Sequence, residues 1–188
     1  MSAQALRIED LPHYTYEDYA QWKDDWELIR GIPYAMVPAP LIGHQRISSR
    51  IDRQLSELLD DCSQCESLCA VDWQITEDTV VRPDVLVVCH ENKDIGIIKL
   101  EKTPIIVFEI LSPSTRRKDR GIKYQLYEKA GVTYYCMVDP ESKSADVFLL
   151  QPQKETYQPA DPFQDGMMTF DLGPCRIRFD FGKIFKTI

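Results

Sequence analysis

A carboxylate interrupts an apolar segment of this chain. Glu109 lies in residues 105–111, a short run of aliphatic and β-branched residues with a proline on either side. Such a run predicts a strand that is buried on both faces. With a period of two, Glu109 shares its face with Ile105, Val107 and Leu111. A buried carboxylate is costly, so we expect a metal ion, a cation or a set of hydrogen bonds to compensate it.

Asp84 is a second carboxylate in a similar setting. It follows Arg82-Pro83 and opens the apolar residues 85–88. Two acidic residues on successive buried strands, followed by a basic segment, indicate a divalent cation and a phosphate-ester substrate. A structural role remains possible for each residue. Asp84 could belong to a turn, in which Pro-Asp pairs are common, and Glu109 could face solvent, as a single Glu in a strand usually does.

The basic segment follows the Glu109 strand directly. Its five cationic residues fall within eight positions: Arg116, Arg117, Lys118, Arg120 and Lys123. The formal net charge of −8 argues against a protein that coats nucleic acid through its overall field, but a local basic groove is compatible with it. For Lys118 and Arg120 we expect a solvated helix face.

Hydrophobic periodicity, together with residues that end helices and strands, predicts the secondary-structure elements that would position these residues. His44 lies in the first turn of an expected amphipathic helix and leans toward its buried side. Gly131 is a natural residue to end a helix. The expected helices cover residues 15–23, 42–60 and 115–130, and a hairpin joins 26–29 to 32–36. The expected strands cover residues 70–75, 84–89, 105–111, 132–138 and 145–150. Short hairpin strands at the edge of the sheet are expected after these.

This order predicts an α/β fold, an α+β sandwich in which helices flank a mixed β-sheet. With 188 residues and 44% hydrophobic content, the chain can bury one good core. We therefore expect a single domain over residues 1–188. Its core would span about 42–150, with an N-terminal extension over 1–41 and C-terminal strands over 151–188.

The six cysteines invite a disulfide or metal interpretation. Cys62, Cys65 and Cys69 cluster at helix-like spacing, while the others lie in strand-like contexts that suggest packing. Residues 1–10 show no basic-then-apolar signal pattern, and no apolar run approaches the roughly 20 residues of a membrane helix. We therefore expect a soluble cytoplasmic protein, no membrane partner and reduced thiols. A metal-thiolate site would need a fourth ligand beyond these three cysteines.

Several segments together resemble the Uma2 family, which is assigned to the PD-(D/E)XK, or restriction-endonuclease-like, superfamily. The resemblance covers nearly the whole chain and loosens after about Pro152. Its strongest parts are Arg82-Pro83-Asp84, Glu-x-x-Ser-Pro-Ser-Thr from Glu109, and Lys123 with Tyr127. The other matching segments are residues 16–19, 26–31, 131–132 and 135–140, and His44.

The resemblance implies a magnesium-dependent phosphodiesterase core. Asp84 and Glu109 would bind Mg²⁺, for which Mn²⁺ could substitute, and the carbonyl of Ile110 could add a ligand. The superfamily's lysine should stand two residues after the acid, where this chain has Leu111. The resemblance suggests that Lys123, on the following helix, has taken over this role. Tyr127 is four residues further on and would share its helical face.

Glu27 and His44 are secondary candidates for the catalytic site. Glu27, on a hairpin strand, could be a third carboxylate of the metal site, and His44 could assist the metal or a water molecule. A structural role fits each of them as well. Ser112 and Ser114 are better explained as helix-capping residues than as nucleophiles.

Three hypotheses follow. The first is a metal-dependent endonuclease, acting on DNA, with Asp84, Glu109 and Lys123 as its site. The second is a non-catalytic member of the fold that binds nucleic acid or a protein. The third is a structural protein whose carboxylates merely pair with Arg82, Arg116 or Lys123. By analogy with nucleases of this fold, we expect a homodimer.

Overall fold

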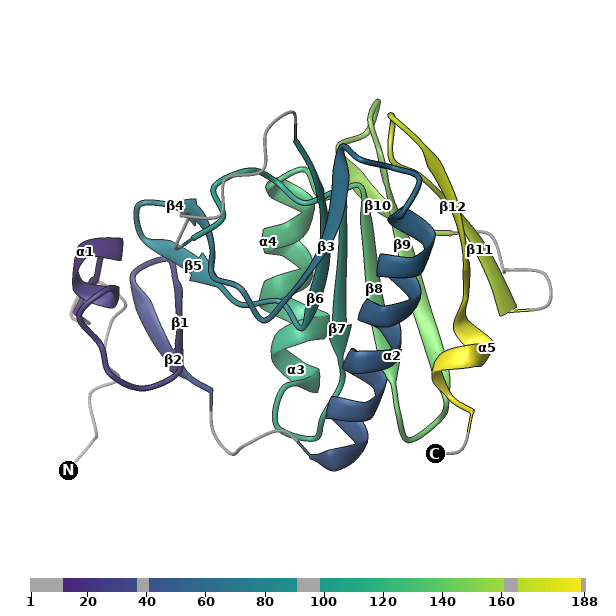
Figure 1. The fold of residues 1–188 in the computed structure, drawn as a ribbon. Coiled ribbons are helices and arrows are strands. Elements are labelled where there is room, and N and C mark those ends of the chain that lie inside the picture. The colour runs from purple at the N-terminus through teal and green to yellow at the C-terminus, as the bar shows by residue number, and fades with distance from the viewer. Residues whose placement is uncertain (1–11, 37–40, 91–98, 161–165, 187–188) are drawn as a thin grey trace.

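The computed structural model describes residues 12–36, 41–90, 99–160 and 166–186 (Figure 1). Helical segments are α1 (Tyr16–Tyr19), α2 (Ile42–Leu59), α3 (Arg116–Lys118), the π-helical turn η2 (Asp119–Lys123), α4 (Tyr124–Lys129) and α5 (Phe181–Ile184). Strands are β1 (Trp26–Ile29), β2 (Ile32–Ala35), β3 (Cys65–Cys69), β4 (Trp73–Thr76), β5 (Thr79–Val81), β6 (Val85–Cys89), β7 (Ile106–Ile110), β8 (Tyr134–Asp139), β9 (Ser144–Gln151), β10 (Thr156–Pro159), β11 (Met167–Asp171) and β12 (Arg176–Asp180).

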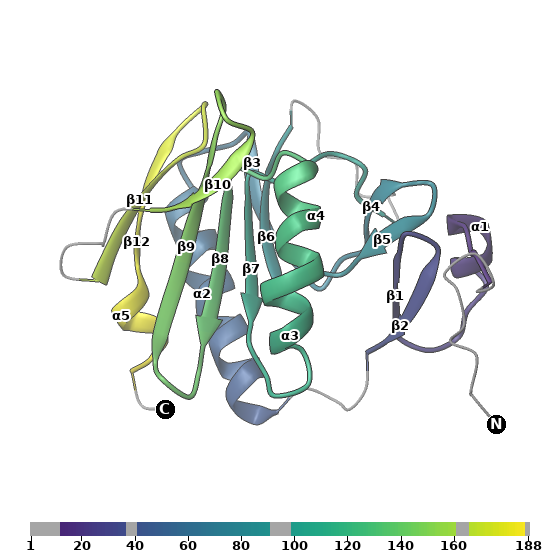
Figure 2. The same ribbon diagram turned by 180° about the vertical axis from the view of Figure 1, so that it is seen from behind.

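A six-stranded sheet of order β10-β9-β8-β7-β6-β3 forms the centre of the molecule. Among the described strands of this sheet, only β7 and β8 pair in parallel, and the chain between them crosses over through α3, η2 and α4. α2 covers one face of the sheet, and α3 with α4 covers the other (Figures 1 and 2). The expected mixed sheet between helices is therefore confirmed.

Both faces of this sheet are buried. On the α2 side, Ile51 and Leu55 belong to the same apolar cluster as Phe108. On the other side, Val107 belongs to a cluster with Tyr127 and other residues of the crossover. Strand β7 thus contributes alternate residues to two cores, as its continuous apolar run predicts.

The N-terminal strands build a second sheet, of order β2-β1-β5-β4. The turn between β1 and β2 places Arg30 at φ 53° and Gly31 at φ 73°, the left-handed conformations of a tight hairpin turn. The strand expected over residues 70–75 begins only at Trp73, as β4, and the preceding β3 belongs to the central sheet instead. Between them Ala70 has φ 49°, which interrupts the extended backbone.

The C-terminal strands only partly follow the expectation. β10 extends the central sheet at its edge, but β11 and β12 form a separate hairpin. This hairpin and α5 lie beside α2 (Figure 1). The reason is aromatic packing, since Phe170, Phe179 and Phe181 all have ring centroids within 6.3 Å of that of Phe108.

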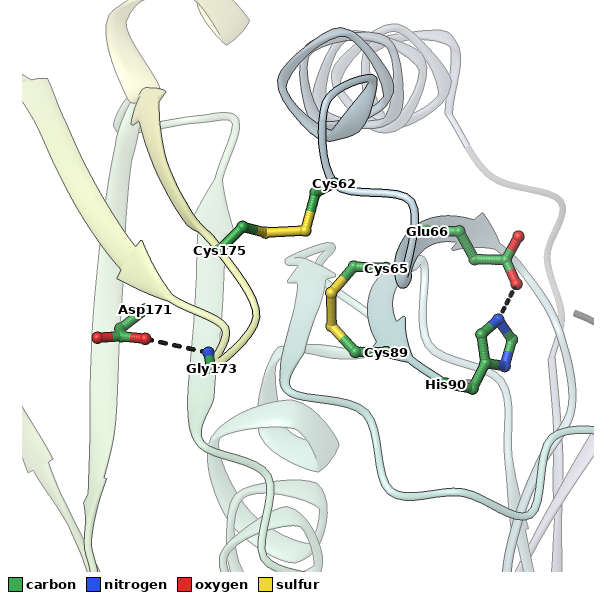
Figure 3. The surroundings of a disulfide bond; sticks show 8 residues. All are labelled: Cys62, Cys65, Glu66, Cys89, His90, Asp171, Gly173 and Cys175. Carbon is green, nitrogen blue, oxygen red and sulfur yellow. Dashed lines mark hydrogen bonds and ion pairs between the residues drawn. A yellow bond between two sulfur atoms is a disulfide. The ribbon is translucent and has the colours of Figure 1, made fainter. Parts of the chain in front are cut away.

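The expectation of six reduced thiols is wrong. Disulfides join Cys62 to Cys175 and Cys65 to Cys89 (Figure 3). Cys65 begins a strand rather than continuing a helix, and its antiparallel register with β6 sets it directly opposite Cys89. Cys62 and Cys175 are 113 residues apart in sequence, so the local spacing of the cysteines could not reveal that they pair. Cys69 and Cys136 are free.

Within the described residues, no helix has both the length and the apolar character that a membrane span requires.

Phe108 is the residue that most directly tests this packing. It is fully buried, so Phe108→Ala should lower the free energy of unfolding by about 3–5 kcal/mol, as expected for a large aromatic side chain removed from a core. Urea denaturation measures this loss. Phe148→Ala, at a partly buried site on β9, is the control and should cost less. A loss below about 1 kcal/mol for Phe108→Ala would contradict the packing described above.

Candidate functional site

Asp84 and Glu109 lie where β6 and β7 stop pairing. The two strands are in register from Val87↔Ile106 to Val85↔Phe108. Asp84 immediately precedes β6, and its Oδ2 accepts a hydrogen bond of 2.7 Å from the backbone N–H of Ile110. The Asp84 carboxylate thus accepts a backbone N–H of β7 at the point where the backbone pairing of the two strands ends. Both acids are thereby brought to the same end of neighbouring strands.

Glu109 is buried, with 3% of its surface exposed. Its Oε1 accepts hydrogen bonds from Lys123 Nζ at 2.8 Å and from the Tyr127 hydroxyl at 2.6 Å. The predicted common face of Lys123 and Tyr127 is confirmed, and it is turned toward Glu109. A cation and a hydrogen bond compensate the carboxylate, as its burial requires.

Glu27 reaches the same lysine from the second sheet. Its Oε1 lies 2.7 Å from Lys123 Nζ and also accepts the backbone N–H of Arg82 at 3.0 Å. Its Oε2 pairs with Lys118. The expectation of a solvated Lys118 is wrong, because the buried Glu27 attracts its ammonium group. Arg120 does lie at the surface, paired with Asp146.

His44 contacts the site through Asp84. Its Nε2 lies 3.1 Å from Asp84 Oδ2, and the side chain is mostly buried. Burial alone would lower the pKa of His44, but the hydrogen bond and the charge of Asp84 outweigh it and raise the pKa. His44 therefore holds Asp84 from the α2 side while Ile110 holds it from β7.

Asp119 is a site residue that the sequence reasoning missed. It lies in η2 with 1% of its surface exposed, and Lys123 Nζ is 4.0 Å from its Oδ1. Neither carboxylate oxygen has a hydrogen-bond partner within the described part of the chain. The spacing of four residues before Lys123 was a signal that could have found it. A π-helical turn at this point is also typical of functional sites.

Carboxyl groups outnumber lysines in this cluster. Burial raises the pKa of Glu109 well above its ordinary value, against the effect of Lys123 and with the neighbouring carboxylates adding to it. Burial likewise raises the pKa of Asp119. Burial would also raise the pKa of Glu27, but Lys123 and Lys118 outweigh it and lower that pKa. Burial would lower the pKa of Lys123, yet the carboxylates around it raise it, so Lys123 remains an ammonium ion.

A pocket of about 980 Å³ opens onto these groups. Its lining includes Asp84, Glu109, Ile110, Lys123, Asp119 and His44, together with the basic side chains of Arg82, Arg117 and Lys118. Glu27 is absent from this lining and is fully buried. The structure therefore brings five of the six predicted groups to one pocket and sets Glu27 behind Lys123.

The fold recurs in a protein of known structure. A crystal structure titled as "a putative nuclease belonging to DUF820", from Anabaena variabilis ATCC 29413, superposes with a TM-score of 0.72 at 18% sequence identity. The match covers 92% of this chain and 97% of that one. At this identity the likeness shows a common fold.

The sequence comparisons define the family. The family model of Uma2, described as "Putative restriction endonuclease", matches residues 16–171. An uncharacterized protein of Synechocystis, slr1290, is 31% identical over 145 residues, which cover 73% of this chain and 75% of the relative. The chain belongs to the Uma2 family.

Replacing Lys123 tests how much the fold depends on the buried charges. Lys123→Met should destabilise the protein by about 3–5 kcal/mol at neutral pH, because Glu109 loses its cation and Glu27 keeps only Lys118. Unpaired buried carboxyls have folded-state pKa values above their unfolded ones, so the variant loses stability as pH rises through the ordinary carboxyl range. In the wild type, Lys123 and Lys118 lower the pKa of Glu27, so the stability that this residue contributes is lost as pH falls. The difference between the two should therefore shrink toward acid pH.

Urea denaturation at a series of pH values measures this difference. Lys129→Met, at an exposed position on α4, is the matched control and should stay close to wild type throughout. A destabilisation by Lys123→Met that is the same at acid and neutral pH would contradict the charge network as its cause.

Proposed function

We propose that this protein is a Mg²⁺-dependent endonuclease that hydrolyses phosphodiester bonds of DNA. One observation carries the proposal: Asp84 and Glu109 stand at the diverging ends of β6 and β7 and line one pocket. The chain's membership of a family described as "Putative restriction endonuclease" supports the reaction class.

The donor set fits a hard divalent cation. Among the described residues, the hydrogen bonds and ion pairs of Glu109 all use Oε1 and those of Asp84 all use Oδ2. Each carboxylate thus has a second oxygen for a ligand in the pocket, and the carbonyl of Ile110 is a third candidate. Mg²⁺ prefers such oxygen ligands and retains water, and Mn²⁺ takes the same set. The excess of carboxylates over lysines favours a cation there.

Bound Mg²⁺ would lower the pKa of an attacking water and stabilise negative charge on the phosphoryl oxygens. The chain's own residues have the remaining roles. Lys123 lines the pocket, where its ammonium group, held by Glu27 and Glu109, can orient a water or a phosphoryl oxygen. His44 fixes the orientation of Asp84. Arg117, exposed at the pocket, provides positive charge for a phosphate backbone.

Glu27 acts in this proposal as a positioning residue. Its side chain is fully buried, lies outside the pocket lining and holds Lys123 Nζ at 2.7 Å. It would keep Lys123 charged and aimed at Glu109 without touching the substrate. Asp119, whose buried oxygens lie no closer than 4.0 Å to Lys123 Nζ and which lines the pocket, is a further candidate to bind the metal or a metal-bound water.

The second candidate function is a non-catalytic module that binds nucleic acid or a protein. The observation in its favour is that Lys123 and Tyr127 already compensate Glu109 without a metal ion. Leu111 also occupies the position of the superfamily's lysine. This reading predicts a stable protein that does not respond to Mg²⁺ or Mn²⁺.

Metal titration by calorimetry, together with a plasmid-nicking assay on the same samples, separates the two functions. We expect the wild type to bind Mg²⁺ and Mn²⁺ and to nick plasmid DNA. Asp84→Asn and Glu109→Gln should abolish the metal binding and lower nicking by about 10²-fold or more, because each removes a charged ligand but keeps the side-chain shape.

Asp146→Asn and Glu141→Gln are the matched controls, since they make the same chemical changes at exposed positions. Both should retain wild-type binding and nicking. Wild-type protein that binds no metal, even with DNA present, would overturn the nuclease proposal and favour the binding module. Large losses of stability in Glu109→Gln without any metal response would instead indicate a purely structural carboxylate.

We further propose that the protein acts in the cytoplasm as a homodimer, so that two sites can reach two strands of a duplex. β10 is an edge strand of the central sheet and offers backbone groups for pairing with a second copy. Sedimentation equilibrium over a concentration series should show a dimer, and Gln158→Pro on β10 should weaken it. A monomer at every concentration would contradict this assembly.

A further inference from the structure

Four cysteines from four separate segments meet at one place. Cys62 follows α2, Cys65 begins β3, Cys89 ends β6, and Cys175 lies in the turn between β11 and β12 (Figure 3). The sulfur atoms of Cys62, Cys65 and Cys175 all lie within 4.8 Å of one another. The sulfur of Cys89 is bonded to that of Cys65. The two disulfides are therefore neighbours rather than independent crosslinks.

This arrangement has the dimensions of a zinc-thiolate centre. With Zn–S bonds of about 2.3 Å, the sulfur atoms of a tetrahedral site lie about 3.8 Å apart. Once the disulfides are reduced, the bonded sulfurs would move apart to this distance, and the three grouped sulfurs already lie within 4.8 Å of one another. Cys62-Ser63-Gln64-Cys65 also has the C-x₂-C spacing that is typical of zinc ligands, and the backbone N–H of Cys65 donates to the Cys62 carbonyl at 2.9 Å across this turn.

We propose that in the reduced protein Cys62, Cys65, Cys89 and Cys175 bind one Zn²⁺ ion, and that the disulfide pair and the zinc site are alternative states of the same cluster. Each disulfide takes two electrons and two protons from one dithiol reductant, which is itself oxidised to a disulfide. Two dithiols thus give four thiols. These release four protons as Zn²⁺ binds, and the zinc keeps its oxidation state.

Cys89 is the fourth ligand rather than the adjacent His90. His90 points away from the sulfur atoms and pairs with Glu66, whose Oε1 lies 2.6 Å from its Nε2 (Figure 3). Cys62, Cys65 and Cys89 are buried and Cys175 is partly buried. Four thiolates in a closed, buried setting are typical of a structural zinc site and leave no open position for catalysis.

The chain around Cys175 is already shaped for ligation. Asp171 Oδ1 accepts the backbone N–H of Gly173 at 3.0 Å, and Leu172 N–H donates to the Cys175 carbonyl at 2.9 Å. Gly173 has φ 86°, which permits the tight turn. Either state of the cluster ties this hairpin to the end of α2 and to the edge of the central sheet. None of the four cysteines lines the Asp84–Glu109 pocket, so the cluster is separate from the proposed nuclease site.

A reducing compartment would favour the zinc-bound form of the cluster over the disulfide form. In a reducing compartment disulfides are rare, and four neighbouring thiols would otherwise remain buried without a bond between them. Zinc binding would restore the connection that the disulfides supply in the oxidised protein. The C-terminal hairpin would then stay attached under both conditions.

Cobalt substitution tests the site without relying on activity. The full chain is reduced with a dithiol, desalted without oxygen and titrated with Co²⁺. We expect one equivalent to produce the intense visible bands of tetrahedral thiolate-bound Co²⁺, and one equivalent of Zn²⁺ to remove them. The Asp84→Asn variant should give the same spectrum, because a carboxylate site produces no thiolate bands. Protein that retains both disulfides should bind no Co²⁺ in this way.

Cys62→Ser and Cys175→Ser should weaken Co²⁺ binding by about tenfold or more and change the spectrum. Cys69→Ser and Cys136→Ser are the matched controls and should bind as wild type does. Circular dichroism confirms that each variant is folded, and if one is not, the wild-type spectrum still decides the outcome. Reduced wild-type protein without thiolate bands, or full binding by Cys62→Ser, would overturn the proposal.

Discussion

The ammonium group of Lys123, buried between two carboxylates, is the interaction on which the arrangement of this molecule depends. It lies 2.7 Å from Glu27 and 2.8 Å from Glu109, so it joins the N-terminal sheet to the central sheet through the crossover helix. Buried ion pairs are stable only when further hydrogen bonds satisfy the remaining groups. Tyr127 does so for Glu109, and the backbone N–H of Arg82 does so for Glu27. Loss of Lys123 would leave Glu109 without a cation and Glu27 with Lys118 alone.

This network also defines the character of the pocket. Its lining combines the carboxyl groups of Asp84, Glu109 and Asp119 with basic side chains, among them the exposed Arg117. A divalent cation is complementary to the carboxyl groups, and a phosphate backbone is complementary to the basic side chains. The formal net charge of −8 therefore does not describe the local field that a nucleic acid would meet.

Strand β6 connects the two special regions of the fold. Asp84 precedes its first residue and Cys89 is its last, which separates them by five residues of extended chain, or about 17 Å. The cysteine cluster holds the far end of β6 against α2 and the C-terminal hairpin. A strand fixed at that end, and packed on both faces along its length, keeps Asp84 in a constant position relative to Glu109.

The sequence by itself determined the local elements and the main pair of acids. Periodicity was enough for α2, β6 and β7, and the i, i+4 spacing was enough to aim Lys123 and Tyr127 at Glu109. It did not reveal the separate N-terminal sheet, the buried Asp119, the recruitment of Lys118 by Glu27, or the pairing of Cys62 with Cys175. Periodicity reports which face of an element is buried, but not which distant segment covers that face. Those contacts join residues up to 113 positions apart, and only the tertiary structure decides them.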